Sequence, residues 1–349
     1  MNQDRPAKSA TRAEVAQRAG VSTAVVSYVL TGAKRVSSAT EARVRAAIDE
    51  LGYRPNGTAR ALRTGRSSML GIVIPDIGNP YFAEFVREFE RAVAGRNFAI
   101  TVASSHGDPE EELRLVESLR GRAVDGLAVA SVVHAARRAE VHGAGGPIVW
   151  IDAFDPEPGS FTVGADAETG ARSLVEHLIA VHDRRNIAIV LAPSRRPGIE
   201  PREVGWRSAL RAAGLPDGPI ELVDDWTREF GAGAGRRLFT RPDRPDAIFA
   251  ASDFLGIGLL SAAAELGVSI PDDVPVVSYD GTAESEFSIP KLTTYRQPVA
   301  RMARATADAL IDAVPTDSRH LVFPGELVIR RSCGCTTATA HEPLTTGDS

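Results

Sequence analysis

Residues 11–30, TRAEVAQRAGVSTAVVSYVL, decide how the first part of the chain folds. Thr11 and Glu14 have the spacing of a capping box, in which each side chain accepts a hydrogen bond from a free backbone N–H at the start of a helix. Gly20 supplies a backbone that can turn sharply after the first helix, and Ser22 can cap a second one. The stretch therefore predicts two short helices joined by a tight turn.

The second of these helices is expected to have one buried face and one open face. Val26, Val29 and Leu30 fall on one side at helical spacing and would pack against the first helix. The opposite face is small and polar enough to enter the major groove of DNA, where hydrogen bonds and methyl contacts distinguish base edges. This face comprises Thr23, Ala24, Ser27 and Tyr28. An ordinary helical hairpin in a core is the alternative.

Charge is divided unevenly along the chain. Residues 1–66 contain twelve Lys or Arg and five Asp or Glu, a net charge of +7, although the 349 residues together carry −5. The remainder therefore carries −12. Such asymmetry indicates a polyanionic partner for the basic N-terminal segment and an acidic remainder that is repelled by it.

The length and composition are those of a globular protein with two or three domains, since 43% of the 349 residues are hydrophobic. The longest apolar runs, such as residues 187–192, have the length of a strand and fall far short of a membrane span. The first ten residues lack the apolar core of a secretion signal. We therefore expect a cytoplasmic protein with no membrane partner.

Cys333 and Cys335 are the only cysteines in the sequence and stand as Cys-Gly-Cys near its end. One such pair cannot form a disulfide framework. It is compatible with a redox couple or part of a metal site, but an incidental pair is the expectation. His177 and His182 are five residues apart, which does not place them on one helical face as a spacing of four would. The sequence thus predicts neither a bound metal nor a cofactor.

A third helix is expected to start at Ser38, because Ser38 and Glu41 repeat the capping-box spacing. Gly52 would end it in the left-handed conformation. Beyond the break at residues 53–56, the stretch from 57 to 63 is too short and polar to form a stable helix alone. It is either a flexible linker or a hinge that folds only when bound.

From residue 68 onward, strand-length apolar runs alternate with helical stretches, which is the pattern of a parallel sheet. Strands are expected near residues 68–75, 98–104, 124–130, 147–152, 161–165, 186–192, 219–223, 246–251 and 274–280. Helices are expected to begin near Asn79, Asp108 and His134 and to span about 166–181, 201–213, 229–239 and 254–266. Two α/β lobes fit these counts better than one sheet. A ligand cleft would lie where the carboxyl ends of their strands face each other.

The sequence closely resembles the LacI/GalR (lac repressor) family of bacterial transcription regulators. The resemblance rests on VAQRAGVSTAVVSYVLTG, ELGYRPNGTARALRTGRSSMLGIVIPDIGNPYF, PDAIFAASDFLGIG and later segments at 272–280 and 292–298, and it covers about residues 11–332. It implies an all-α helix-turn-helix DNA-binding head with a hinge helix. An α/β body of two lobes, like that of a periplasmic binding protein, would follow.

The resemblance also implies domain boundaries: a helix-turn-helix domain in 1–55, a hinge in 56–66, an effector-binding and dimerisation domain in 67–332, and a tail in 333–349. Lobe one is expected to comprise about 67–160 and 293–320, and lobe two about 161–292 and 321–332. The implied function is transcriptional regulation, in the commoner case repression, by a homodimer on a pseudopalindromic DNA operator. A small-molecule effector such as a sugar, bound between the lobes, would control operator affinity.

Matching positions receive roles from the family pattern. The DNA-binding residues implied in this way are Ser22, Thr23, Ala24, Ser27, Tyr28, Thr31, Asn56, Ala59, Leu62 and Arg63. Among them Leu62 matches a leucine that wedges into the minor groove. The implied effector-binding residues are Asp76, Asn79, Tyr81, Phe82, Arg202, Trp226, Ser252, Asp253 and Asp280. Carboxylates and Arg suit the vicinal hydroxyls of a sugar, and an aromatic ring packs against its C–H face.

Four positions depart from the family pattern, and one of them is Val25, where Thr is common. Tyr28 stands where Arg is usual and Thr31 where Asn is usual, so we expect an operator half-site that differs from the family's. Ser252 stands where Asn is frequent, which leaves the identity of the effector open.

Two rival functions fit the sequence less well. Gly231-Ala-Gly-Ala-Gly235 is similar to a dinucleotide fingerprint, but no strand precedes it as that motif requires. Because no catalytic motif is present either, we do not expect an enzyme. A transport receptor with the same two-lobe fold needs export, and a basic segment stands where its signal peptide would be.

Overall fold

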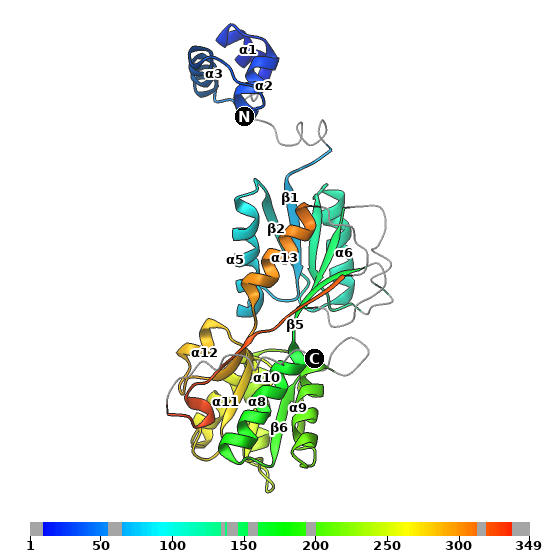
Figure 1. Cartoon of the computed structure of the whole chain (residues 1–349), viewed down its shortest axis with the longest axis vertical. Coiled ribbons are helices and arrows are strands. Elements are labelled where there is room, and N and C mark those ends of the chain that lie inside the picture. The colour runs from blue at the N-terminus through cyan, green and yellow to red at the C-terminus, as the bar shows by residue number, and fades with distance from the viewer. Residues whose placement is uncertain are drawn as a thin grey trace, which may run out of the picture. The chain divides into compact units, whose positions relative to one another are not determined.

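The computed structural model describes residues 10–54, 65–133, 137, 146–152, 160–192, 200–312 and 319–336. Two compact units make up the chain, an all-α head within residues 1–67 and an α/β body within residues 68–349 (Figure 1). The helix expected near His134 and four residues expected to bind DNA, Asn56, Ala59, Leu62 and Arg63, lie outside the described residues. Among the described residues, no helix is both long enough and apolar enough to span a membrane.

The described residues of the head form three helices, α1 (Arg12–Ala19), α2 (Thr23–Thr31) and α3 (Ser38–Leu51). The predicted capping box is present, since Thr11 Oγ1 accepts a hydrogen bond from the backbone of Glu14 and the Thr11 N–H donates to Glu14 Oε2 at 2.6 Å. Gly20 ends α1 with φ +63°, a value that favours glycine. The predicted helix-turn-helix is therefore confirmed.

One cap in the head differs from the prediction. Ser37, not Ser38, precedes α3, and its Oγ accepts a hydrogen bond from the N–H of Thr40. Glu41 then falls one residue beyond the capping-box position and pairs instead with Arg45 at 2.7 Å. Both serines can cap a helix, so the backbone conformation at Ser37 decides between them, which the spacing alone does not reveal.

A small apolar core joins the three helices of the head. Val15, Val26 and Val44, one from each helix, are completely buried. Val29 and Leu30 pack against this core from α2, as their spacing predicts. Because one face of α2 packs against this core, the opposite face remains open.

The body contains two six-stranded sheets of equivalent strand order. The order in lobe one is β11-β5-β4-β3-β1-β2, and all of these strands run parallel. They are β1 (Met69–Ile74), β2 (Ala99–Ser104), β3 (Gly126–Ala130), β4 (Ile148–Ile151), β5 (Phe161–Ala165) and β11 (Arg319–Phe323). The order in lobe two is β12-β10-β9-β8-β6-β7, with only β12 antiparallel among the described strands. They are β6 (Ile187–Leu191), β7 (Ile220–Leu222), β8 (Ala247–Ala250), β9 (Val276–Asp280), β10 (Thr293–Arg296) and β12 (Glu326–Val328).

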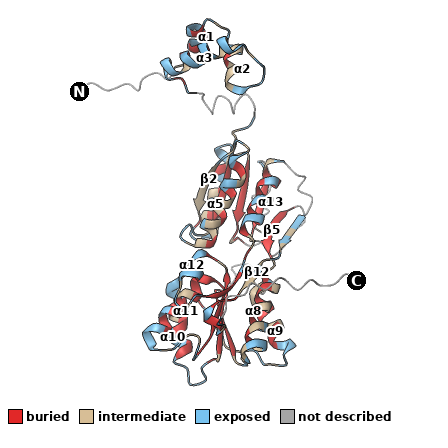
Figure 2. Ribbon diagram, turned by 60° about the vertical axis from the view of Figure 1, so that its left-hand side comes forward, coloured by how far each residue is buried: buried red, intermediate tan, exposed pale blue. Residues whose placement is uncertain are grey.

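Helices cover both faces of each sheet, which explains why the central strands are continuous apolar runs and are buried throughout (Figure 2). In lobe one they are α5 (Pro80–Ala94), α6 (Pro109–Gly121) and α13 (Val299–Ile311). In lobe two they are α8 (Ala167–His182), α9 (Pro201–Ala212), α10 (Arg228–Phe239), α11 (Asp253–Leu266), the short α12 (Ala283–Phe287) and the 3-10 turn η2 (Arg331–Cys333). The predicted two-lobe α/β body is confirmed.

The predicted division of segments between the lobes is wrong in three places. Residues 321–323, expected in lobe two, belong to β11 and pair with β5 in lobe one. Residues 161–165, expected in lobe two, form β5 and pair with β4 in the sheet of lobe one. Residues 293–296, expected in lobe one, form β10 and pair with β9 in lobe two. The chain crosses between lobes after β5, after β10 and after β11 (Figure 1). These segments form strands at the edge of a sheet or next to it, and their partners depend on the order of strands in that sheet. The alternation of strands and helices in the sequence indicates only that a strand exists.

The glycine run that resembled a dinucleotide fingerprint lies inside α10. A side-chain carbon at Gly231 would collide with the backbone of Leu255 in α11, and one at Gly235 would press on Ala262. These glycines therefore let α10 and α11 pack closely, and they do not form a phosphate-binding turn.

Candidate functional site

The open face of α2 is one candidate site. Thr23 and Ala24 are exposed near its N-terminus, and Ser27 and Tyr28 follow half-buried one turn later. The ammonium of Lys34 lies 5.9 Å from the centre of the Tyr28 ring, within range of a cation–π contact. This surface combines hydroxyls, a methyl group and a positive charge, as a base-reading surface requires.

Two other predicted DNA contacts also have roles within the head. Ser22 caps α2, with its Oγ 3.4 Å from the N–H of Val25. The Thr31 hydroxyl donates to the carbonyl of Ser27 at 2.8 Å. Both side chains are accessible to solvent, so each hydroxyl can contact a phosphate while it keeps its local hydrogen bond.

A second candidate site is a cavity of about 160 Å³ in the body. Residues that follow β1, β3 and β4 line it from lobe one, and residues that follow β6, β7, β8 and β9 line it from lobe two. The strand order reverses between β1 and β3 in lobe one and between β6 and β8 in lobe two. Parallel sheets bind ligands at such switch points, because the loops there diverge and leave a crevice.

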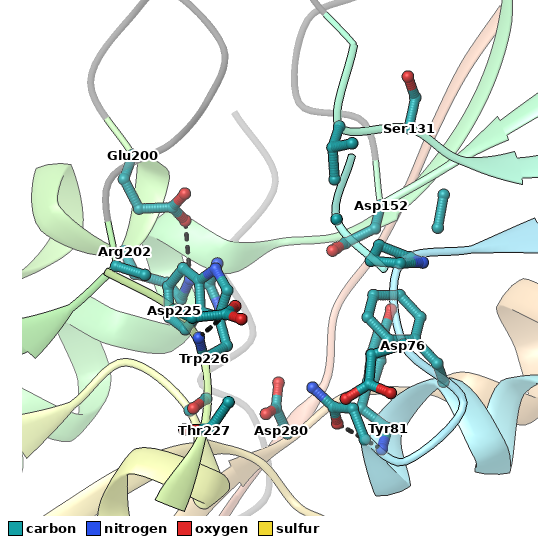
Figure 3. A pocket seen from close by; sticks show the side chains of 18 of the residues that line it. Asp76, Tyr81, Ser131, Asp152, Glu200, Arg202, Asp225, Trp226, Thr227 and Asp280 are labelled. Carbon is teal, nitrogen blue, oxygen red and sulfur yellow. Dashed lines mark hydrogen bonds and ion pairs between the residues drawn. The ribbon is translucent and has the colours of Figure 1, made fainter. Parts of the chain in front are cut away.

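Most of the predicted effector-binding residues line the cavity. Figure 3 shows Asp76, Tyr81 and Asp152 on one side, facing Arg202 and Trp226 on the other. Eight of the nine predicted residues line it, namely Asp76, Asn79, Tyr81, Phe82, Arg202, Trp226, Ser252 and Asp280.

Arg202 is the cation among the described residues that line the cavity. Its side chain is 11% exposed, its Nε donates to Glu200 at 2.7 Å and its Nη1 donates to the carbonyl of Ala251 at 2.8 Å. The guanidinium lies 4.4 Å from the centre of the Trp226 ring. Burial acts to lower the pKa of Arg202, but Glu200, Asp152 and Asp280 together outweigh burial and raise the pKa. The cation is thus held rigidly, with its guanidinium over an aromatic ring.

Asp280 ends β9 at the floor of the cavity. Its backbone has φ +122°, which is strained for a residue with a side chain, and its Oδ1 accepts a hydrogen bond from Gln297 at 2.9 Å. Burial and the nearby Asp253 carboxylate raise the pKa of Asp280 well above its ordinary value. A protonated Asp280 can donate a hydrogen bond to a ligand as well as accept one.

Asp253, the ninth predicted residue, does not line the cavity. It is completely buried, and its two oxygens accept four hydrogen bonds of 2.6–2.8 Å. The donors are the hydroxyls of Ser278, Thr282 and Thr294 and the backbone N–H of Thr282. Asp253 is therefore a buried tie between α11, β9 and β10, and its assignment to effector binding is corrected.

The lobe-one side of the cavity is shaped by the start of α5. Asn79 caps this helix, with its Oδ1 accepting from the N–H of Tyr81 at 3.0 Å, and Asp76 accepts from the N–H of Gly78 at 2.8 Å. The rings of Tyr81 and Phe82 meet edge to face with centres 5.0 Å apart. Burial, with Asp152 and Asp280 nearby, raises the pKa of Tyr81 well above its ordinary value, so its phenol stays protonated.

Several polar residues of the cavity were missed at the sequence level. Ser131 and Asp152 follow β3 and β4 directly, and Asp224 and Asp225 follow β7 closely. Their position at the carboxyl ends of parallel strands is the signal that could have found them. The further polar residues that line the cavity are Glu200 and Thr227.

These two sites define a class of protein in which a helix-turn-helix head is joined to a two-lobe body with a polar cavity between its lobes. Residues 11–56 match the bacterial regulatory proteins of the lacI family, and residues 175–333 match a periplasmic binding protein-like domain. The ribose operon repressor of Escherichia coli (strain K12) is 31% identical over 309 residues, which are 87% of this chain and 93% of that protein.

Solved structures of transcriptional regulators are also similar to this chain. The lac repressor dimer bound to operator and the anti-inducer ONPF has a TM-score of 0.85 and 26% identity, covering 93% of this chain and 99% of its own. A complex of the transcriptional regulator CelR with cellobiose has a TM-score of 0.69 and 31% identity, with the same coverage of 93% and 99%. The chain belongs to the lacI family of bacterial regulatory proteins. It is a DNA-binding transcriptional regulator and not an enzyme.

Proposed function

We propose that this regulator is a repressor whose operator affinity is controlled by a neutral, hydroxyl-rich small molecule bound between its lobes. The observation that carries the proposal is the cavity at the switch points of both sheets, with Arg202 and Asp280 buried at its wall and floor. Ribose and cellobiose appear in the names of two relatives, which supports a sugar as the ligand class.

The charges around the cavity favour a neutral ligand over an anionic one. Among the described residues that line it, six carry carboxyl groups, namely Asp76, Asp152, Glu200, Asp224, Asp225 and Asp280, and Arg202 carries a guanidinium. Because Glu200 already pairs with that guanidinium, a phosphate group would compete with this carboxylate for Arg202 and would lie close to the other acidic side chains, which repel it. Hydroxyl groups, in contrast, can donate to carboxylates and accept from Arg202.

The proposed DNA contacts are the open face of α2 and the hinge. Thr23, Ala24 and Tyr28 would read base edges in the major groove, while Ser22, Ser27 and Thr31 contact phosphates or bases. The proposed hinge, residues 56–66, would place Leu62 in the minor groove with Ala59 and Arg63 beside it, and Asn56 is a further proposed DNA contact. A homodimer like that of the lac repressor would present two such heads to a pseudopalindromic operator.

Control would follow from a population shift. A ligand that binds one lobe arrangement better than another stabilises it, and the dimer passes that preference to the hinges. Such a protein works in the cytoplasm, where its DNA is. The proposed boundaries are residues 1–55 for the head, 56–66 for the hinge, 67–332 for the effector-binding and dimerisation domain and 333–349 for the tail.

A thermal-unfolding screen of the full chain tests the ligand class. Neutral sugars and their phosphate esters are compared at equal concentration, and we expect a neutral compound to raise the melting temperature of the body. The same compound should change operator affinity about 5- to 150-fold, the usual range of allosteric coupling. Stabilisation by phosphate esters alone would contradict the charge argument, and no effect of a stabilising ligand on operator binding would contradict the control.

Selection of preferred operator half-sites tests the role of Tyr28. Tyr28→Arg introduces a side chain that pairs with guanine through two hydrogen bonds, worth about 1–3 kcal/mol of discrimination. We expect the variant to select a different base at one position of each half-site. An identical preferred sequence for both proteins would show that Tyr28 does not read a base.

A further inference from the structure

Two histidines and two cysteines converge in lobe two, in a place that the effector cavity does not include. His177 and His182 belong to α8, while Cys333 ends η2 and Cys335 follows it two residues later. One ligand atom from each of the four lies within 4.8 Å of all the others. The predictions of an incidental cysteine pair and of two histidines on different faces did not anticipate this cluster.

The distances within the cluster match those between the ligands of a tetrahedral metal ion. The two histidine Nε2 atoms are 3.3 Å apart. Three of the four nitrogen-to-sulfur distances are 3.4 Å for His177–Cys333, 3.7 Å for His177–Cys335 and 3.5 Å for His182–Cys335, and the fourth lies within 4.8 Å. Zinc bonds to nitrogen and sulfur at their ordinary lengths place tetrahedral ligands about 3.3–3.4 Å apart for two nitrogens and about 3.5–3.6 Å apart for nitrogen and sulfur.

Hydrogen bonds alone explain this convergence poorly. The Nε2 of His177 faces the Nε2 of His182 and the sulfurs of both cysteines within 3.7 Å. An imidazole nitrogen has one proton or one lone pair in the ring plane, so it can serve only one such partner well. A cation at the centre would instead accept one lone pair from each of the four atoms.

Gly334 allows the two cysteines to approach the histidine pair. It has φ +111°, a conformation that favours glycine, and a side-chain carbon at this position would lie 3.2 Å from the ring of His182. Gly334 thus lets the chain reverse between the two cysteines so that both sulfurs face the imidazoles.

We propose that His177, His182, Cys333 and Cys335 bind one Zn²⁺ ion in a closed, structural site. Two imidazoles and two thiolates are a donor set that zinc takes in tetrahedral geometry, and four protein ligands leave no position for a substrate. Each thiol releases its proton as it coordinates, so two protons leave for each zinc bound. The site would clamp the segment after β12 onto the C-terminal end of α8 and stabilise lobe two.

Metal analysis of the full chain, without a polyhistidine tag, tests the site directly. We expect one zinc per chain after incubation with Zn²⁺ and removal of the excess. Replacement by Co²⁺ should give the visible bands of a tetrahedral ion and the near-ultraviolet band of cobalt–thiolate bonds. Binding of less than about one tenth of an equivalent, or an octahedral cobalt spectrum without a thiolate band, would overturn the proposal.

Single substitutions locate the ion. Cys335→Ser removes one sulfur at a half-buried position, and we expect zinc affinity to fall by more than about 100-fold, since even second-shell changes cost 10- to 100-fold. His106→Asn is the matched control, because His106 is exposed, lies outside the cluster and has φ +52°, which Asn tolerates. Unchanged affinity in Cys335→Ser would refute the assignment, as would a loss in His106→Asn equal to that in Cys335→Ser.

Two further measurements keep the test independent of folding. Zinc should raise the melting temperature of the parent chain and leave that of Cys335→Ser unchanged. Thiol counting under anaerobic conditions should find two thiols that zinc protects from alkylation. A Cys333–Cys335 disulfide that persists without oxygen and excludes zinc would identify a redox couple instead.

Discussion

The open face of α2 and the cavity of the body are assembled in opposite ways. The residues of the α2 face lie within one nine-residue helix, Thr23–Thr31, and its orientation depends on a cap, a glycine and a small core in the same segment. The cavity takes residues from both lobes, from Pro75 in lobe one to Asp280 in lobe two, and they lie at the ends of several strands and the starts of helices. A surface of the first kind can be read from local sequence, whereas one of the second kind depends on sheet order.

Val26→Asp tests whether the head is independent of the body, and the largest effect is expected here. Val26 is completely buried in the core of three helices. An unpaired carboxylate at that position costs several kcal/mol, which is comparable to the whole stability of a bundle of this size. We expect DNA binding to be lost in a mobility-shift assay while ligand binding to the body is unchanged.

The control is Ala46→Ser, an exposed change on α3 of the same head that leaves the core intact and lies outside the proposed DNA contacts. Retention of operator binding by Val26→Asp would contradict the role of this core, and loss of ligand binding would show that the two units fold together.

Arg202→Ala tests the contribution of the cavity in the body to ligand binding. The change removes the buried cation that pairs with Glu200 and stacks on Trp226, so we expect ligand affinity to fall by more than about 100-fold, or roughly 3 kcal/mol. Calorimetry with the ligand found in the screen measures the loss. Arg207→Ala on the same helix is the control, because Arg207 pairs with Glu203 and Asp217 and does not line the cavity. Equal losses in both variants would indicate damage to α9 and not a contact with ligand.

The variants Asp253→Asn and Asp280→Asn distinguish a buried residue that stabilises the fold from a residue that contacts the ligand. In Asp253→Asn the new amide group would face three hydroxyl donors and one N–H, so we expect a loss of about 2–3 kcal/mol in stability with little change in ligand affinity. Because the pKa of Asp280 is raised well above its ordinary value, an amide at that position resembles the protonated carboxyl, and we expect a larger effect on ligand affinity than on stability. Denaturant unfolding and ligand titration of both variants check the pair, and the reverse pattern would restore Asp253 to the site.

Thr11→Ala should have the smallest effect. It removes the capping box at the start of α1, and loss of such a cap costs about 1 kcal/mol. Thermal unfolding of the head should show a small decrease in stability, with the operator preference unchanged. A changed preference would mean that Thr11 affects the orientation of α2.

Local signals in the sequence determined most of the head and the kinds of element in the body. The capping box at Thr11, the turn at Gly20 and the apolar spacing of Val26 act within a few residues, so their outcome needs no distant partner. The strands of the body were equally visible as apolar runs, because strands covered on both faces leave a continuous pattern. The eight predicted residues that line the cavity came from family resemblance, and spacing alone would not have identified them.

Only the tertiary structure decided which residues meet. It assigned β5 and β10 to their sheets, buried Asp253 behind the cavity, and brought Ser131 and Asp152 into it. It also placed two cysteines beside two histidines that are more than 150 residues away in sequence. The physical reason is the same in each case: caps and periodicity depend on neighbours in the chain, whereas strand pairing and side-chain convergence depend on the packing of segments that are far apart in the sequence.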